Sequence, residues 1–279
     1  SSGFVARMRL TELHAKTNKQ NVPNAREGIS GAMELQDQVV FITGGAGGLG
    51  RAMCHEFANQ GARLIVGYRS NAAGAAALVG ELGGDGHSAK EAPVEDSRRL
   101  TSLAGEIEAE YGRLDILINN AGITRFVAHN DLDGLDDELI DDIFRTNWRG
   151  AFACVRALRP LLGTGAGGLV INISSIAGVT AMGSNIAYCA SKAAMNTMTM
   201  SLARALAPQI RVVSLSPGLA ETDFVTGLDQ AWWDEQSQRT PLQRLARPED
   251  VAQAALAVAT GLKFSNGCII AVDGGRPLT

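Results

Sequence analysis

Three residues in the second half of the chain have side chains that could together move a proton: Ser175, Tyr188 and Lys192. A helix over residues 185–207 would place Tyr188 and Lys192 one turn apart on one face, with the ammonium group near the phenol. A free phenol has a pKa near ~10, and a neighbouring positive charge lowers that pKa. Tyr188 is therefore a candidate general acid or base. Ser175, in a predicted loop after a strand, could donate a hydrogen bond to a carbonyl oxygen.

The Tyr-x-x-x-Lys spacing alone is weak evidence, because both residues are common in helices. A second motif stands earlier in the chain. Residues 39–42 form an apolar run typical of a strand buried on both faces. The stretch Thr43–Gly50 then fits both Gly-x-Gly-x-x-Gly and Thr-Gly-x-x-x-Gly-x-Gly. Glycines between a strand and a helix let backbone amides approach a pyrophosphate, whose charge the helix dipole favours. The alternative is a glycine-rich turn that binds no ligand.

The end of the next predicted strand, residues 63–67, indicates which dinucleotide would bind. In dinucleotide folds an acidic residue there accepts a hydrogen bond from the ribose 2′-hydroxyl, whereas an arginine accommodates a 2′-phosphate. This chain has no acid at that point but offers Arg69 and Ser70. The pattern favours NADP(H) over NAD(H); the alternative is that Arg69 is only a solvated surface residue.

Apolar runs and helical periods alternate along the rest of the chain, which is typical of βα units. We expect helices over residues 72–82, 97–111, 185–207 and 248–260, with Asn147 on a further helix that begins in the acidic cluster 131–142. The prediction is an α/β fold: a single doubly wound, Rossmann-like domain with a mostly parallel seven-stranded sheet that binds its ligand at the carboxyl ends of the strands. The expected strands are residues 39–42, 63–67, 87–92, 114–118, 168–173, 210–215 and 268–272.

Composition excludes several other classes of protein. The 279 residues are 46% hydrophobic and 19% charged, with a net charge of −4, as in ordinary globular proteins. The sequence has no dense basic run, which argues against a nucleic-acid partner. No apolar run reaches the ~18 residues of a membrane span. The four cysteines lie far apart without a Cys-x-x-Cys pair, and the histidines lack metal-ligand spacing. We therefore expect reduced thiols, no bound metal and a cytoplasmic protein.

The first 32 residues differ from the remainder, with five basic and two acidic side chains and no convincing period. They could be a native arm, a processed leader or residues added for expression, with Met33 as the native start. The expected division is an extension over residues 1–32 and a dinucleotide-binding domain over 33–279.

From about Glu34 onward the chain resembles the short-chain dehydrogenase/reductase family. Any one of the family's motifs can match by chance. Their shared order along an independently predicted alternation of strands and helices is strong evidence for the resemblance. The matching motifs are Thr43–Gly50, Asn119–Gly122, Asn147, Ser175, Tyr188 with Lys192, Pro217-Gly218 with Thr222, and Asp273–Gly275.

The resemblance implies that the chain exchanges hydride between NADP(H) and a small carbonyl or alcohol substrate. Tyr188 would protonate the carbonyl, Lys192 would lower the phenol pKa and hold the nicotinamide ribose, and Ser175 would polarise the substrate oxygen. Asn147 would support a water that relays protons. A homo-oligomer, by analogy a tetramer, is also implied. The implied cofactor contacts are Gly44, Gly48, Leu49, Gly50, Arg69, Ser70, Val94, Asn120, Ala121, Gly122, Tyr188, Lys192, Pro217, Gly218 and Thr222.

Two positions depart from the family pattern. Members that use NADP(H) often carry a basic residue where this chain has Gly47, and the aspartate common near the adenine is replaced by Pro93, which leaves only the backbone of Val94. The same chemistry with NAD(H), and a cofactor-binding scaffold without turnover, remain alternatives. The substrate stays open among acyl thioesters, sugars or polyols, steroid-like ketones and diketones. A segment over residues 219–241, bearing Trp232 and Trp233, is expected to be a substrate lid or a packed surface helix.

Overall fold

The central strands have apolar side chains on both faces and are buried between two layers of helices, whereas the edge strand over residues 88–91 is mostly polar and only partly buried. The computed structural model describes residues 35–165, 167–220 and 230–278. Along the first strand, Val40 and Ile42 pack into one core cluster while Val39 and Phe41 pack into another, as the alternation of a pleated strand requires. The strands are β1 (Val39–Ile42), β2 (Arg63–Tyr68), β3 (Ser88–Glu91), β4 (Ile116–Asn119), β5 (Gly168–Ile173), β6 (Ile210–Pro217) and β7 (Ile269–Val272).

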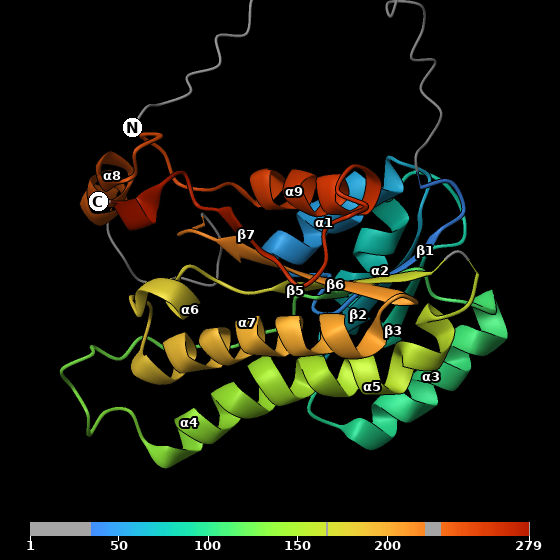
Figure 1. Cartoon of the computed structure of the whole chain (residues 1–279), viewed down its shortest axis with the longest axis horizontal. Helices are drawn as coiled ribbons and strands as arrows, with labels where there is room; N and C mark the ends of the chain where they lie inside the picture. Colours follow the sequence, from blue (N-terminus) through green and yellow to red (C-terminus); the bar gives the residue numbers. More distant parts are fainter. Residues whose placement is uncertain (1–34, 166, 221–229, 279) are drawn as a thin grey trace, which may run out of the picture. The chain divides into compact units, whose positions relative to one another are not determined.

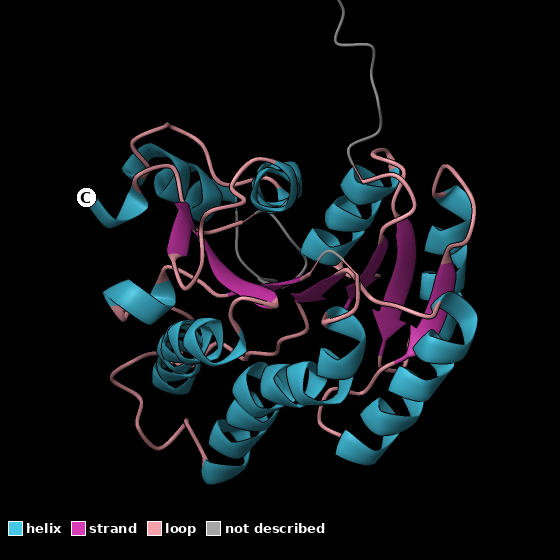
Figure 2. Ribbon diagram, turned by 45° about the vertical axis from the view of Figure 1, so that its right-hand side comes forward, coloured by secondary structure: helices cyan, strands magenta, loops and turns pink. Residues whose placement is uncertain are grey.

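All seven strands are parallel and lie in the order β3-β2-β1-β4-β5-β6-β7. Helices α1, α2 and α9 contribute to the core on one face, and α3, α5 and α7 to the core on the other. Figure 1 shows the two helix layers, and Figure 2 shows the sheet between them. The helices are α1 (Gly48–Ala58), α2 (Ala72–Glu81), α3 (Ser97–Tyr111), α4 (Asp137–Phe144), α5 (Ala151–Leu162), α6 (Ala177–Thr180), α7 (Ile186–Leu206), α8 (Gln230–Arg239) and α9 (Pro248–Thr260), with a π-helix η1 (Arg145–Gly150) and a 3₁₀-helix η2 (Arg276–Leu278).

The strand order reverses between β1 and β4, and the loops after these two strands are tied together. The Thr43 hydroxyl accepts hydrogen bonds from the backbone N–H groups of Asn120 and Ala121, each at 3.0 Å. The Asn120 side chain in turn donates to the carbonyls of Thr43 and Gly44, also at 3.0 Å. A switch point of this kind is where doubly wound sheets bind ligands.

The helix that carries Asn147 has an irregular middle. It begins at Asp136, whose carboxylate caps the N–H of Leu139, and acidic residues occupy its first turn. This confirms that the acidic cluster is a helix N-terminus. The backbone then widens into the π-helix η1 around Asn147 before α5 continues. The sequence indicates no such widening, which is a feature often found at functional sites.

A buried chain of polar side chains joins the sheet to α7. Asn119 on β4 donates to the amide oxygen of Asn172 on β5, and Asn172 donates to the Thr199 hydroxyl on α7, each at 2.9 Å. Thr199 in turn donates to the Met195 carbonyl. Because unpaired buried polar groups are costly, these bonds fix the register of α7 against the sheet.

The predicted doubly wound α/β architecture and its seven strands are confirmed. The differences lie at element ends: β4 begins at Ile116 and β6 extends to Pro217. The short helix α6 was not expected, and the tryptophan-bearing stretch 230–239 forms α8. In the described part of the chain no helix is long and apolar enough to cross a membrane. The expected extension over residues 1–32 lies outside the described residues.

Candidate active site

The structure brings Ser175, Tyr188 and Lys192 together at the carboxyl end of β5. Asn185 caps α7 by accepting a hydrogen bond from the N–H of Tyr188, so the tyrosine lies in the first turn of that helix. The Lys192 ammonium lies 5.6 Å from the centroid of the Tyr188 ring. Ser175 hydrogen-bonds the Tyr188 hydroxyl. The predicted i, i+4 pair and its serine partner thus share one site.

The electrostatics of the tyrosine differ from the sequence-based expectation. Burial raises the pKa of Tyr188 to about 12, and the hydrogen bond from Ser175 only partly opposes this rise. The prediction that the pKa of Tyr188 lies below its ordinary value is therefore wrong for this structure, because desolvation of the phenolate outweighs the favourable contacts. At neutral pH the phenol keeps its proton, which suits a group that donates a proton to a carbonyl.

The lysine is held in place by backbone groups. Lys192 is 4% exposed, and its ammonium donates to the carbonyl of Ile173 at 2.8 Å. Burial lowers its pKa to about 8. Helix α6 packs closely over this turn of α7, since a Cβ added at Gly178 would lie 2.7 Å from the carbonyl carbon of Lys192. A Cβ added at Gly122 would lie 3.8 Å from the Lys192 ammonium, so the loop after β4 also reaches the site.

Asn147 lies beside the site, and its side chain forms hydrogen bonds with other protein groups. Its amide oxygen accepts from the N–H of Ile123 at 2.8 Å. Its amide nitrogen donates to the Ile123 carbonyl at 3.1 Å and to the Ser191 hydroxyl at 3.2 Å. The side chain therefore holds the loop after β4 against α7, and support for a relay water remains a prediction.

The loop after β1 forms a cradle that fits a dinucleotide pyrophosphate. Gly44 has a φ of +61°, which favours glycine. A Cβ added at Gly50 would lie 2.4 Å from the Gly44 carbonyl oxygen, so only glycine permits this close approach. Helix α1 begins directly after Gly47 without a side-chain cap, which leaves its first N–H groups suited to an anion. The residues present fit the cofactor that the sequence implies.

Other predicted cofactor residues lie around the same edge of the sheet. Arg69 and Ser70 are exposed at the end of β2. Val94 is buried against η1, where a Cβ added at Gly150 would lie 2.6 Å from it. Pro217 ends β6, and Gly218 donates its N–H to the Val272 carbonyl. Thr222 lies outside the described residues. Gly48 and Leu49 open α1, and Ala121 follows the Asn120 tie described above.

Sequence reasoning missed the residues that hold the loop after β4. The sequence predicts Asn185 only as the start of a helix, yet its amide also donates to the Arg125 carbonyl at 2.7 Å. Thr124 and Ser184 share a hydrogen bond between their hydroxyls. An asparagine before a helix predicts the cap; no sequence signal predicts the partners on the distant loop.

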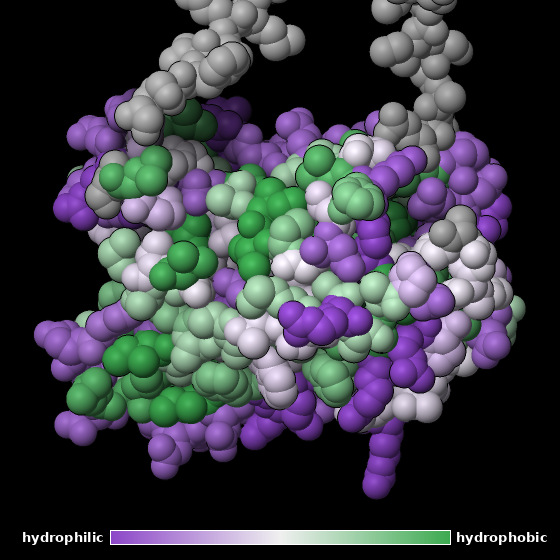
Figure 3. Space-filling view, in the orientation of Figure 1, coloured by the Kyte–Doolittle hydropathy of each residue, from purple (hydrophilic) through white to green (hydrophobic). Residues whose placement is uncertain are grey.

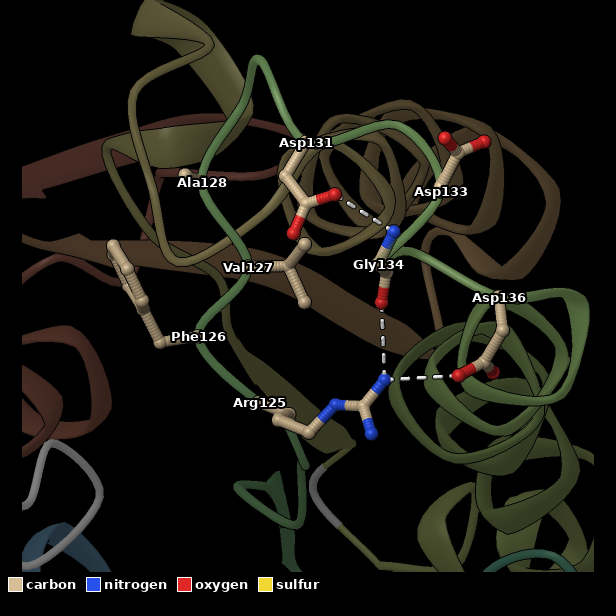
Figure 4. A pocket seen from close by; sticks show the side chains of 8 residues that line it. All are labelled: Arg125, Phe126, Val127, Ala128, Asp131, Asp133, Gly134 and Asp136. Atoms are coloured by element: carbon tan, nitrogen blue, oxygen red, sulfur yellow. Dashed lines mark hydrogen bonds and ion pairs between the residues drawn. The ribbon is translucent and has the colours of Figure 1, made fainter.

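An open pocket of about 510 Å³ is lined by residues of this loop between positions 125 and 136. Figure 4 shows Arg125 directed toward the Gly134 carbonyl and Asp136, with Phe126 turned away from that pair. No group of three or more metal-ligating side chains occurs among the residues that the structure describes. Three of the free cysteines are buried, and burial raises the pKa of the Cys189 thiol, consistent with a packing role.

Comparison with known proteins identifies the family. The sequence model of the short chain dehydrogenases matches residues 38–232. The chain is 37% identical over 246 residues to a protein named ketoacyl reductase 2 of the granaticin polyketide synthase in Streptomyces violaceoruber, covering 86% of this chain and 96% of that one. It is 33% identical over 247 residues to a 3alpha-hydroxysteroid dehydrogenase of Mediterraneibacter gnavus, covering 87% and 98%.

A solved structure has the same fold. The 3-ketoacyl-(acyl-carrier-protein) reductase of Brucella melitensis, complexed with NADH, is 30% identical with a TM-score of 0.80. The match covers 87% of this chain and 99% of that chain.

Burial of Lys192 should leave a signature in the pH dependence of stability. The unfolded chain holds this proton up to about pH 10.5, whereas the folded protein releases it near pH 8. Between these values the unfolded state binds more protons, so the free energy of unfolding should rise with pH. Relative to Lys192→Met, the wild type should gain about 1–3 kcal/mol from pH 8 to 10.5.

Urea unfolding of both proteins at several pH values measures this difference. Lys263→Met, at an exposed position after α9, shows what removal of a surface lysine does alone. If the difference in unfolding free energy between wild type and Lys192→Met stays constant from pH 7 to 10.5, the lowered pKa of the buried Lys192 is contradicted.

Proposed function

Because this chain belongs to the short-chain dehydrogenase family, we propose that it is an oxidoreductase that transfers hydride between NADP(H) and a carbonyl or secondary alcohol. Tyr188 is the proton donor and acceptor. The observation that supports this proposal best is the convergence of Ser175, Tyr188 and Lys192 beside the glycine cradle.

Ser175, Tyr188 and Lys192 each have a separate role in the reduction. NADPH, when bound, supplies the hydride. Ser175 donates a hydrogen bond to the carbonyl oxygen and stabilises the charge that develops there. Tyr188 transfers its proton to the same oxygen, and the high pKa of its buried phenol keeps that proton available at neutral pH. The Lys192 ammonium, held over the ring, stabilises the phenolate that remains. Oxidation of an alcohol uses the same groups in reverse.

The cofactor preference depends on the end of β2. Arg69 and Ser70 are exposed there, and the absence of an acidic residue removes the usual acceptor for an unmodified ribose. This supports NADP(H). NAD(H) is the second candidate, since the Brucella melitensis reductase is complexed with NADH and Gly47 offers no positive charge.

The surroundings of the site favour a carbonyl carried on an apolar body. Phe126, Val179 and Met182 are 76%, 71% and 60% exposed, and Ile186 begins α7 with a partly exposed side chain. Figure 3 shows a hydrophobic area over the end of the molecule where α6 and the start of α7 lie. Relatives named as a polyketide ketoacyl reductase and a hydroxysteroid dehydrogenase act on such compounds by their names. Sugars and polyols fit this surface less well.

Assembly and closure belong to the same proposal. Trp148 on η1 and Met200 on α7 are exposed, which supports association of these helices in a homotetramer. In the segment over residues 219–241, α8 is the described helix that would close over the substrate, and it places Trp232 and Trp233 edge to face with centroids 5.1 Å apart. Residues 221–229 lie outside the description.

Loss of NADPH absorbance with a panel of carbonyl compounds tests the reaction and its substrate class. We expect kcat/KM for bicyclic aromatic ketones and steroid ketones to exceed that for ketoses by about 10-fold or more, since burial of each additional CH₂ is worth about 0.8 kcal/mol. A higher kcat/KM for ketoses would contradict the apolar class. NADPH binding without oxidation by any compound would instead support a scaffold.

Arg69→Asp tests the cofactor preference. Removing the guanidinium should weaken NADPH by about 1.5–3 kcal/mol, the value of a hydrogen bond to a charged group. The new carboxylate should improve NADH by accepting from the ribose hydroxyl. The measured quantity is the ratio of kcat/KM for the two cofactors. Arg98→Asp, at an exposed position on α3, is the matched control. A ratio that moves equally in both variants would show that Arg69 is an ordinary surface residue.

A further inference from the structure

The first turn of α7 is held by an asparagine that bonds in two directions. Asn185 is 1% exposed. Its amide oxygen accepts from the Tyr188 N–H at 2.7 Å, as a helix cap does. Its amide nitrogen donates to the Arg125 carbonyl at 2.7 Å and to the Thr124 hydroxyl at 3.2 Å. Aspartate would also cap the helix but could not donate to the loop, and the hydroxyl of serine or threonine has one hydrogen, whereas the amide donates to two loop acceptors.

A second route of hydrogen bonds leads from the same loop back to the same tyrosine. Asn147 holds Ile123 through both its N–H and its carbonyl. The Asn147 amide also donates to the Ser191 hydroxyl, which donates to the Tyr188 carbonyl at 2.8 Å. The backbone N–H and C=O of Tyr188 are therefore joined through Asn185, residues 123–125, Asn147 and Ser191 in one closed ring.

The loop lies along the chain that precedes α7. The Val127 N–H donates to the Ser184 carbonyl at 2.9 Å, and His129 hydrogen-bonds the Gly183 carbonyl at 3.1 Å. In Figure 4 the Arg125 side chain extends from the loop toward Asp136, while the Phe126 side chain points away from that pair. The hydrogen bonds of the backbone of residues 123–129 thus orient the apolar and charged side chains that the loop carries.

We propose that Asn185 is a positioning residue for the reduction described above. It fixes the distance between the Tyr188 hydroxyl and a carbonyl bound against residues 123–129, because it bonds to the backbone on both sides. The inference rests on the proposed function. Its geometric basis is separate, since the ring of hydrogen bonds exists whatever the substrate is.

Asn185→Asp separates the two tasks of the side chain. The carboxylate still accepts from the Tyr188 N–H and so keeps the cap, but it cannot donate to the loop and faces the Arg125 carbonyl oxygen. We expect kcat to fall about 10–100-fold, since small misplacements of reacting groups cost this much, while the Kd of NADPH changes less than about 3-fold. Thr124→Val removes one loop acceptor and leaves the cap intact; kcat should fall less.

Asn71→Asp is the matched control. Asn71 caps α2 by accepting from the Gly74 N–H at an exposed site, so its aspartate variant should keep kcat at saturating NADPH within about twofold, while the carboxylate next to Ser70 should raise the Kd of NADPH. The test compares kcat, KM and NADPH Kd of the four proteins, with urea unfolding to measure folded protein under assay conditions. Unchanged kcat in Asn185→Asp would overturn the proposal, as would a loss of kcat explained by an equal loss of folded protein.

Hydrogen exchange provides a readout that does not need turnover. In Asn185→Asp the amides of residues 123–127 should exchange at least about 10-fold faster than in the wild type, whereas Asn71→Asp should leave them unchanged. If the wild type shows no turnover, the proposed function fails. The exchange rates then still decide whether Asn185 holds this loop, and equal rates in the wild type and Asn185→Asp would show that it does not.

Discussion

The site depends on burying a lysine next to a tyrosine at the end of a parallel strand. An ammonium group that is 4% exposed is expensive to desolvate, and its pKa falls to about 8 as a result. What stabilises it is the carbonyl of Ile173, the last residue of β5. The close approach of α6 at Gly178 and the polar chain from Asn119 to Thr199 keep α7 at the required distance.

Three asparagines lie around this centre, and the side chain of each joins a loop to another part of the chain through hydrogen bonds. Asn120 binds the loop after β1, Asn147 binds Ile123, and Asn185 binds both the tyrosine and the loop after β4. The reason is chemical, because an amide donates and accepts through a rigid planar group. Loops that would otherwise move independently are thereby coupled to the sheet, which supplies the fixed frame for the proposed proton transfer.

Much of this arrangement follows from the sequence. The short apolar runs predict the buried strands, and the glycine stretch and the Tyr188–Lys192 spacing predict two elements of the site, because these features depend on neighbours in the chain. The π-helix at Asn147, the partners of Asn185 and the raised pKa of Tyr188 could not be predicted. Each depends on residues dozens of positions away, and the sign of the pKa shift depends on a balance between desolvation and charge that spacing alone does not reveal.

The central claim is that the Tyr188 hydroxyl supplies the proton, and Tyr188→Phe tests it most directly because the ring remains to pack in its place. With kcat and the Kd of NADPH measured together, the account predicts a loss of about 10²–10⁴-fold in kcat, the usual contribution of a general acid, with cofactor affinity nearly unchanged. A variant that retains more than half of the wild-type kcat would contradict it.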